Sequence, residues 1–176
     1  MTNKLSSAGK HAVVVGAGFA GLRAASQLDP QVRVNLIDPA DHFTGRVRLH
    51  ETAAGRPDVT HPLRTFLQST NVPHLRAQVI LIDIGSAKVH TEAGHILDHH
   101  RLVYVLGGRT GGNEVTGASP ERAYTAESPV QLHKRLLDSS RALTVVGGGL
   151  SGIELARPSA RTARHPRVAR LISGAN

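Results

Sequence analysis

The feature that most constrains the fold is a glycine pattern that occurs twice, each time between branched apolar residues and an expected helix. In the first copy, residues 13–22, Gly16, Gly18 and Gly21 have the spacing G-x-G-x-x-G. The first glycine allows a tight turn, the second lets backbone approach a pyrophosphate, and the third lets the helix pack closely on the sheet. A strand, a glycine turn and a helix in this order predict a dinucleotide-binding βα unit.

An acidic residue follows at the position that this kind of unit requires. A second strand-like run, residues 32–37, ends in Asp38, which lies 17 residues after Gly21. A carboxylate at the end of the second strand accepts hydrogen bonds from both hydroxyls of an adenosine ribose. The alternative is a strand-end aspartate that only begins a turn with Pro39. The register of strand, glycines, helix and acid favours the ribose role.

The second copy of the pattern lies in residues 142–156. Gly147, Gly149 and Gly152 repeat the spacing 131 residues downstream, again after branched residues and before an expected helix. Two such copies are hard to explain as the structural glycines of one domain, so the sequence predicts two dinucleotide sites. This arrangement suits the passage of a hydride from a nicotinamide to a second, tightly held redox cofactor.

The residues between the two copies predict helices, strands and one hairpin. Glycine stands in the expected hairpin turn, at Gly94, where a positive φ is needed. Ser128 and Pro129 begin a helix as N-cap and first residue. The expected elements are a helix at 62–69, strands at 74–82, 88–91 and 95–97, a buried strand at 102–106 and a helix at 128–139 that buries Val130, Leu132, Leu136 and Leu137. The fold class is α/β, a Rossmann-like parallel sheet with helices plus a small antiparallel hairpin or meander.

Composition excludes several classes of function for these 176 residues. The chain has no cysteine, which excludes disulfides, thiolate metal sites and a redox-active cysteine pair within it. The net charge of +8 comes mostly from five arginines after Glu154, whereas residues 1–156 carry 16 basic and 13 acidic side chains. A local basic tail without aromatic stacking residues is weak evidence for nucleic-acid binding, so we expect none.

Two other pairs of side chains are candidate sites. Arg46 and Arg48 have the chemistry to neutralise a pyrophosphate, and solvated loop arginines are an equal alternative. His99 and His100 lack a third ligand at metal-binding spacing, so we predict a solvated loop and no metal site. No signal peptide or membrane-spanning segment is evident, and we expect a cytoplasmic protein.

Together these motifs resemble the FAD-dependent pyridine-nucleotide oxidoreductases that have two dinucleotide-binding domains. The resemblance is strongest to the NADH dehydrogenase-like flavoproteins that lack the redox disulfide. It covers nearly the whole chain and rests on several motifs in the family's order. They are residues 13–21 with Asp38 for FAD, 46–50 and 53–55 beside the flavin, 76–79 near the adenine, 98–108 as the second glycine motif and 147–154 for NAD(P)H.

The resemblance implies two sets of cofactor-binding residues. The first set would hold FAD, and consists of Gly16, Ala17, Gly18, Phe19, Ala20, Gly21 and Asp38, with Arg48, Val79 and Gly107 lining the flavin site. The second set would hold NAD(P)H, and consists of Gly147, Gly149, Leu150, Ser151, Gly152 and Glu154, the last close to the nicotinamide. The alternative for Glu154 is a solvated acid favoured by the helix dipole. The cofactors carry out the reaction, so we predict no catalytic acid or base.

Several departures from the family pattern qualify these expectations. Asp38 stands where glutamate is commoner, although both side chains offer a carboxylate. Leu106, Gly107 and Gly108 stand where the family's second glycine motif usually has Ala-Thr-Gly. The larger departure is Pro158, because proline interrupts a helix that should continue for about three turns. Ser173 ends the following strand-like run without an acid, so the choice between NAD and NADP cannot be read.

The chain then stops where relatives continue for roughly as long again. We therefore expect an FAD-binding domain at residues 1–110 that lacks its returning C-terminal strand, and a truncated NAD(P)H-binding domain at 111–176. The leading hypothesis is hydride transfer from NAD(P)H to FAD and on to an unknown small-molecule acceptor. The alternative is a non-catalytic module that binds FAD or another adenine nucleotide. A homo-oligomer and a complementing chain that supplies the missing half both stay open.

Overall fold

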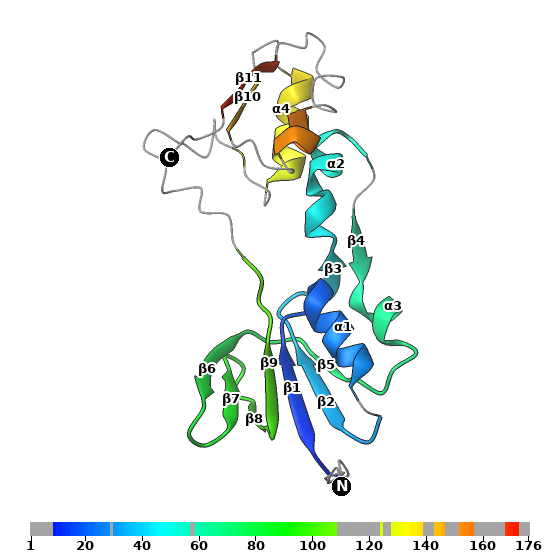
Figure 1. The fold of residues 1–176 in the computed structure, drawn as a ribbon, viewed down its shortest axis with the longest axis vertical. Coiled ribbons are helices and arrows are strands. Elements are labelled where there is room, and N and C mark those ends of the chain that lie inside the picture. The colour runs from blue at the N-terminus through cyan, green and yellow to red at the C-terminus, as the bar shows by residue number, and fades with distance from the viewer. Residues whose placement is uncertain are drawn as a thin grey trace, which may run out of the picture. The chain divides into compact units, whose positions relative to one another are not determined.

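The computed structural model describes residues 9–28, 30–56, 59–108, 124, 128–138, 143–146, 152–156 and 168–172. The chain divides into two compact units (Figure 1). The first unit consists of Met1–Thr44 and Thr60–Gly108, and the second of Gly45–Val59 and Arg109–Asn176. The segment 45–59 thus packs with the C-terminal part of the chain. The predicted domains at 1–110 and 111–176 stay a prediction.

A parallel sheet of four strands in the order β5-β2-β1-β9 forms the centre of the first unit. The strands are His74–Leu75 (β5), Arg33–Ile37 (β2), His11–Val15 (β1) and Arg101–Tyr104 (β9). Val13 of β1 pairs with Asn35 on one side and with Leu102 on the other. Helix α1, Phe19–Gln27, joins β1 to β2 as predicted. The predicted α/β fold with a parallel sheet is confirmed.

The side chains of β1 alternate between two hydrophobic cores, one on each face of the sheet. Val14 packs in the cluster that includes Ala25 of α1, whereas Val13 and Val15 pack in the cluster that includes Val89. All five residues of β1 are buried, as expected for a parallel strand that is covered on both faces. Each fully buried valine contributes about 1.5–3 kcal/mol to folding. The core therefore fixes the strand that leads into the first glycine turn.

The second face is covered by a three-stranded antiparallel sheet in the order β6-β7-β8. Its strands are Val79–Asp83 (β6), Lys88–Thr91 (β7) and Ile96–Asp98 (β8). The predicted hairpin is confirmed, because Gly94 has φ +81° in the turn between β7 and β8. Beside the other face, β3 (His42–Thr44) pairs with β4 (Thr60–Pro62), and α3 (Leu63–Leu67) follows as predicted.

The strand predicted at 102–106 exists as β9, but the expectation that it is buried is wrong. Among the described residues β9 pairs only with β1, so it is an edge strand. Tyr104 is 60% exposed and Leu106 is 54% exposed beyond its end. Apolar residues indicate a strand but do not show where in the sheet the strand lies. An edge strand has a partner on one side only, so its side chains are covered less than those of a central strand.

The second unit contains another parallel strand pair, β10 (Leu143–Val146) with β11 (Val168–Ile172). Residues 152–156 between them are helical, so the predicted strand and helix of the second motif are confirmed, whereas its glycine turn lies outside the described residues. The predicted break at Pro158 lies outside the described residues. Among these parts of the chain, no helix is long and apolar enough to cross a membrane.

Helix α4 (Pro129–Asp138) packs against the short helix α2 (Leu49–Ala53), which follows the 3-10 turn η1 (Arg46–Arg48). Leu132 and Leu136 are buried there together with Ala53. The predicted burial of Val130 and Leu137 is wrong, because these side chains are 50% and 45% exposed. The short α2 covers only one stripe of α4, which leaves the flanking positions open.

Candidate functional site

The first glycine turn follows directly from β1 and is shaped by its two outer glycines. Gly16 has φ +107°, and its N–H donates a 2.8 Å hydrogen bond to the carbonyl of Ile37. A Cβ at Gly16 would lie 2.5 Å from the carbonyl oxygen of Val105. A Cβ at Gly21 would overlap the carbonyl oxygen of Gly16. Both positions therefore require glycine for the fold itself.

Gly18 differs from its two neighbours in the motif. Its φ of −73° is open to any residue, and no heavy atom of the described residues lies within 4 Å of the position a Cβ would take. The described protein thus gives no steric or conformational reason for glycine here. A ligand that approaches the backbone closely would supply that reason, as a pyrophosphate does in dinucleotide-binding turns.

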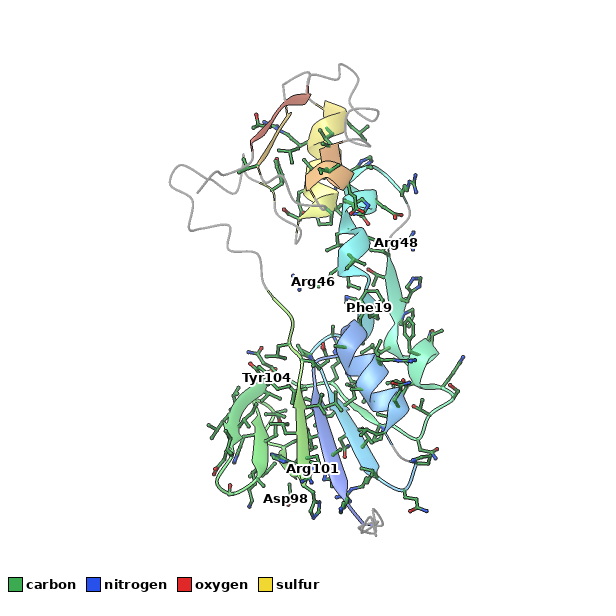
Figure 2. All side chains as sticks on the ribbon, viewed as in Figure 1. Phe19, Arg46, Arg48, Asp98, Arg101 and Tyr104 are labelled. Carbon is green, nitrogen blue, oxygen red and sulfur yellow. The ribbon has the colours of Figure 1, made fainter. Side chains whose placement is uncertain are left out.

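The surface beside Gly18 is open because α1 begins there. Gly18, Phe19 and Ala20 are exposed, whereas Ala17 is buried. The first turn of α1 has no acidic residue and no side-chain cap. Its backbone N–H groups and the positive end of the helix dipole favour an anion at this point. Figure 2 shows Phe19 at this end of α1, and its ring meets Phe43 edge-on with centroids 4.7 Å apart.

Asp38 connects the end of β2 to the glycine turn. The N–H of Ala17 donates to Oδ2 of Asp38 at 2.7 Å, and the N–H of Ala40 donates to Oδ1 at 2.8 Å. A carboxylate has about four acceptor positions, so two of them stay available for ribose hydroxyls. His74 holds the backbone of the same residue, with Nε2 3.1 Å from the Asp38 carbonyl oxygen. Asp38 therefore stabilises the glycine turn by itself, whether or not it also binds a ligand.

The other residues predicted to line the flavin site are more dispersed. Gly107, with φ +71°, follows Val105 and Leu106, whose backbone lies against Gly16, so the chain after β9 returns to the glycine turn. Val79 begins β6 and packs against the cluster on the far face of β1. Its assignment to the adenine side and that of Gly107 to the flavin both stay predictions.

Arg48 belongs to the second unit, where its guanidinium is engaged by Glu51. Nε donates to Oε1 at 3.1 Å and Nη2 donates to Oε2 at 2.8 Å (Figure 2 labels Arg48). Arg56 lies 3.8 Å from the same carboxylate. The residue spacing i, i+3 could have indicated this pair from the sequence. Any anion at Arg48 would compete with Glu51.

This pair predicts a measurable acid sensitivity. Hydrogen bonds from Arg48 hold the pKa of Glu51 below its ordinary value of 4.5. The stabilisation is present above that ordinary value and is lost as pH falls through the lowered pKa of the folded state. Arg48→Gln should therefore flatten the fall in melting temperature between about pH 6 and pH 3. Arg64→Gln, an exposed arginine of α3, should leave the profile unchanged, and an unaltered Arg48→Gln profile would contradict the prediction.

Of the second predicted set, the structure describes Gly152 and Glu154. Gly147, Gly149, Leu150 and Ser151 lie outside the described residues. Glu154 stands in the helical residues 152–156, and its Oε2 lies 3.6 Å from Nδ1 of His50 in α2. Sequence reasoning placed His50 only within the segment 46–50 beside the flavin, and no local spacing signals a pair so far apart in the chain.

Of the adjacent histidines His99 and His100, His100 has a side-chain contact with the backbone. Nδ1 of His100 accepts a 3.0 Å hydrogen bond from the N–H of His11, at the start of β1. Among the described residues no group of three or more His, Cys, Asp or Glu side chains is placed to hold a metal ion. His100 thus has a structural explanation at the start of β1, whereas Nε2 of His99 is buried without a hydrogen-bond partner among the described residues.

The parallel sheet, the glycine turn and the strand-end acid define the fold class, the Rossmann-like fold of FAD/NAD(P)-binding proteins. The model of the pyridine nucleotide-disulphide oxidoreductase family matches residues 10–169. The chain belongs to this family, which confirms the predicted resemblance. This family includes FAD-dependent NADH oxidoreductases.

Individual relatives support the same family. A type II NADH:quinone oxidoreductase of Staphylococcus saprophyticus is 29% identical, over 82% of this chain and 42% of that protein. One from Staphylococcus aureus is 33% identical over 56% of this chain and 26% of its own length. The chain therefore spans less than half the length of these curated relatives.

Solved structures agree on the fold. The sulfide:quinone oxidoreductase of Aquifex aeolicus is 25% identical with a TM-score of 0.67, and the match covers 78% of this chain and 34% of that one. NDH2 from Plasmodium falciparum, solved in complex with NADH, has a TM-score of 0.73 at 19% identity. That match covers 87% of this chain and 37% of the other.

Proposed function

We propose that the chain binds FAD through the first glycine turn and Asp38, and that it contributes to a second site for NAD(P)H. The proposed reaction is hydride transfer from NAD(P)H to FAD, followed by electron transfer to an acceptor. The observation that carries the proposal is the glycine at position 18, which the described fold does not require. Two further observations support it, namely membership of the family and the carboxylate of Asp38 at the end of β2, beside the glycine turn.

In this proposal the residues of the chain bind and orient, and FAD supplies the hydride acceptance when bound. The N–H groups at the start of α1 would hold the pyrophosphate, where the helix dipole favours negative charge. The free acceptor positions of Asp38 would bind the ribose hydroxyls. Gly16 and Gly21 would keep the turn tight enough for both contacts. No side chain is assigned a proton-transfer role.

The test is the Gly18→Ala variant. We expect it to fold, because open space surrounds the new methyl group, and to bind FAD at least tenfold more weakly, a loss of about 1.4 kcal/mol. FAD affinity is measured by quenching of flavin fluorescence, and folding by circular dichroism. Gly85→Ala, in the turn between β6 and β7, adds the same methyl group in ordinary contact with Asp83 and should bind normally. Equal FAD binding by both variants would contradict the proposal.

Turnover is tested separately from binding. The relatives named above are called NADH:quinone oxidoreductases, so a quinone is the first acceptor to offer. Stopped-flow mixing of the FAD-loaded chain with NADH or NADPH should bleach the flavin absorbance. Because the chain spans 42% of the length of its relative, the alternative is a module that binds the nucleotide without turnover. Binding without bleaching would favour that alternative.

A further inference from the structure

The loop that begins with Asp38 lies beyond the paired part of the sheet. Strand β2 pairs with β5 through Leu36 and Ile37, and Ile37 is the last residue of β2. The N–H of Asp38 still donates to the carbonyl of Leu75 at 3.3 Å, but Pro39 has no N–H with which to continue the ladder. The position of the loop after Asp38 therefore depends on contacts other than strand pairing.

Arg76, the first residue after β5, supplies two of these contacts. Its Nε donates to the carbonyl oxygen of Pro39 at 3.2 Å, and its Nη1 donates to Oδ2 of Asp41 at 3.3 Å. The two acceptors belong to residues on either side of Ala40. A guanidinium is rigid and planar, so one arginine holds both acceptors in a fixed arrangement. Arg76 therefore restrains the loop immediately before and after Ala40.

Ala40 in turn orients the carboxylate of Asp38. The N–H of Ala40 donates to Oδ1 of Asp38 at 2.8 Å, and the N–H of Ala17 in the glycine turn donates to Oδ2 at 2.7 Å. One carboxylate oxygen is thus held by the loop and the other by the turn. A shift of Ala40 would rotate the carboxylate and displace the acceptor positions left for a ribose. The contacts of Arg76 therefore act on Asp38 through one backbone amide.

The pair of Arg76 with Asp41 is charged at neutral pH and exposed to solvent. A hydrogen bond from His42 and the charge of Arg76 hold the pKa of Asp41 below its ordinary value of 3.8. The side chains of Arg76 and Asp41 are 66% and 62% exposed. An ion pair as exposed as this contributes little to folding stability. Loss of Arg76 should therefore leave the first unit folded and change mainly the position of the loop.

We propose that Arg76 is a positioning residue of the first nucleotide site, which holds Pro39 and Asp41 so that the carboxylate of Asp38 is oriented for the hydroxyls of an adenosine ribose. The inference rests on the proposed FAD site and adds to it a side chain that acts through the loop. The affinity that the ribose hydroxyls contribute should depend on Arg76. The affinity that the pyrophosphate contributes at the start of α1 should depend on it much less.

The experiment compares the dissociation constants of ADP and 2′-deoxy-ADP for the full chain by isothermal titration calorimetry. The two ligands differ by one hydroxyl, so the ratio of their constants reports its hydrogen bond and cancels a general loss of charge or of folded protein. In the unaltered chain 2′-deoxy-ADP should bind about tenfold or more weakly than ADP. Arg76→Gln should reduce this difference to about threefold or less, because hydrogen bonds weaken steeply when misaligned. Arg76→Lys, which keeps the charge, should give an intermediate ratio.

Arg101→Gln is the matched control. Arg101 is an exposed arginine of the same sheet, and it also donates to a backbone carbonyl, that of His100, at 2.9 Å (Figure 2 labels Arg101). It begins β9 beside Ala12, at the end of the sheet opposite the glycine turn, so its loss should leave the ratio unchanged. Asp41→Asn combined with Arg76→Gln should lower the ratio no further than Arg76→Gln alone, because both changes remove the same contact.

An unchanged ratio in Arg76→Gln, or an equal fall in Arg101→Gln, would overturn the inference. Circular dichroism establishes that each variant is folded, and Arg76→Lys replaces Arg76→Gln in the comparison if the latter does not fold. Equal binding of ADP and 2′-deoxy-ADP by the unaltered chain would instead overturn the ribose role of Asp38, and the inference with it. Absence of any binding of FAD or ADP by the unaltered chain would overturn the proposed site itself.

Discussion

Gly21→Ala is expected to destabilise the first unit by about 3 kcal/mol or more, the largest effect of any single methyl group in the glycine turn. The new Cβ would overlap the carbonyl oxygen of Gly16, and neither backbone can move freely. Gly16 is tied to Ile37 by its N–H and lies against Val105, and α1 begins from the same turn. The expected fall in melting temperature is about 6–12 °C by circular dichroism.

The contrast with Gly18→Ala makes this result informative. Both variants add one methyl group to the same turn, but open space surrounds position 18. We therefore expect Gly21→Ala to lose stability and Gly18→Ala to keep it while losing FAD affinity. A Gly21→Ala protein with unchanged melting temperature would mean that α1 does not approach the turn as closely as the structure indicates.

Asp38→Ala is expected to lower FAD affinity by about a hundredfold or more, because hydrogen bonds to a charged group are worth about 1.5–3 kcal/mol each and two ribose hydroxyls lose their acceptor. The same change leaves the buried N–H of Ala17 without its 2.7 Å partner, so stability should fall by about 1–3 kcal/mol. Equilibrium urea unfolding gives the stability, and flavin fluorescence gives the affinity.

Asp38→Glu is the matched control, since it keeps the carboxylate at the end of β2. We expect it to retain most of the FAD affinity that Asp38→Ala loses. If Asp38→Ala loses stability but binds FAD normally, the acid only organises the turn, which is the role that its bonds to Ala17 and Ala40 already show. That outcome would remove the ribose assignment.

The elements that the sequence predicted well are those defined by local patterns. The branched run of β1 and the glycines after it specify a buried strand, a turn and a helix within a few residues, and Gly94 specifies the hairpin turn. Ser128 and Pro129 likewise place the start of α4. Such signals act through φ, capping and side-chain period, which neighbouring residues determine without help from the rest of the chain.

Predictions of side-chain burial failed where burial depends on which elements become neighbours in the fold. The apolar residues of β9 were expected to be buried, but the strand order places β9 at an edge and leaves Tyr104 exposed. Val130 and Leu137 have the spacing of a buried face, and the short α2 covers only Leu132 and Leu136 of that helix. Periodicity shows which side chains prefer burial, whereas the partner element decides how many of them obtain it.

The sequence by itself determined that two glycine motifs follow branched apolar runs, that an acid ends β2 and that the chain resembles the pyridine-nucleotide oxidoreductases. These features depend on local backbone geometry, so residue type and spacing in the sequence are enough to recognise them. Only the tertiary structure decided how little room a Cβ would have at Gly16 and Gly21 and that open space surrounds Gly18, because these distances depend on Val105 and on other backbone that packs there. It also decided that His50 faces Glu154, because long-range packing of α2 on α4 brings together residues that no sequence spacing relates.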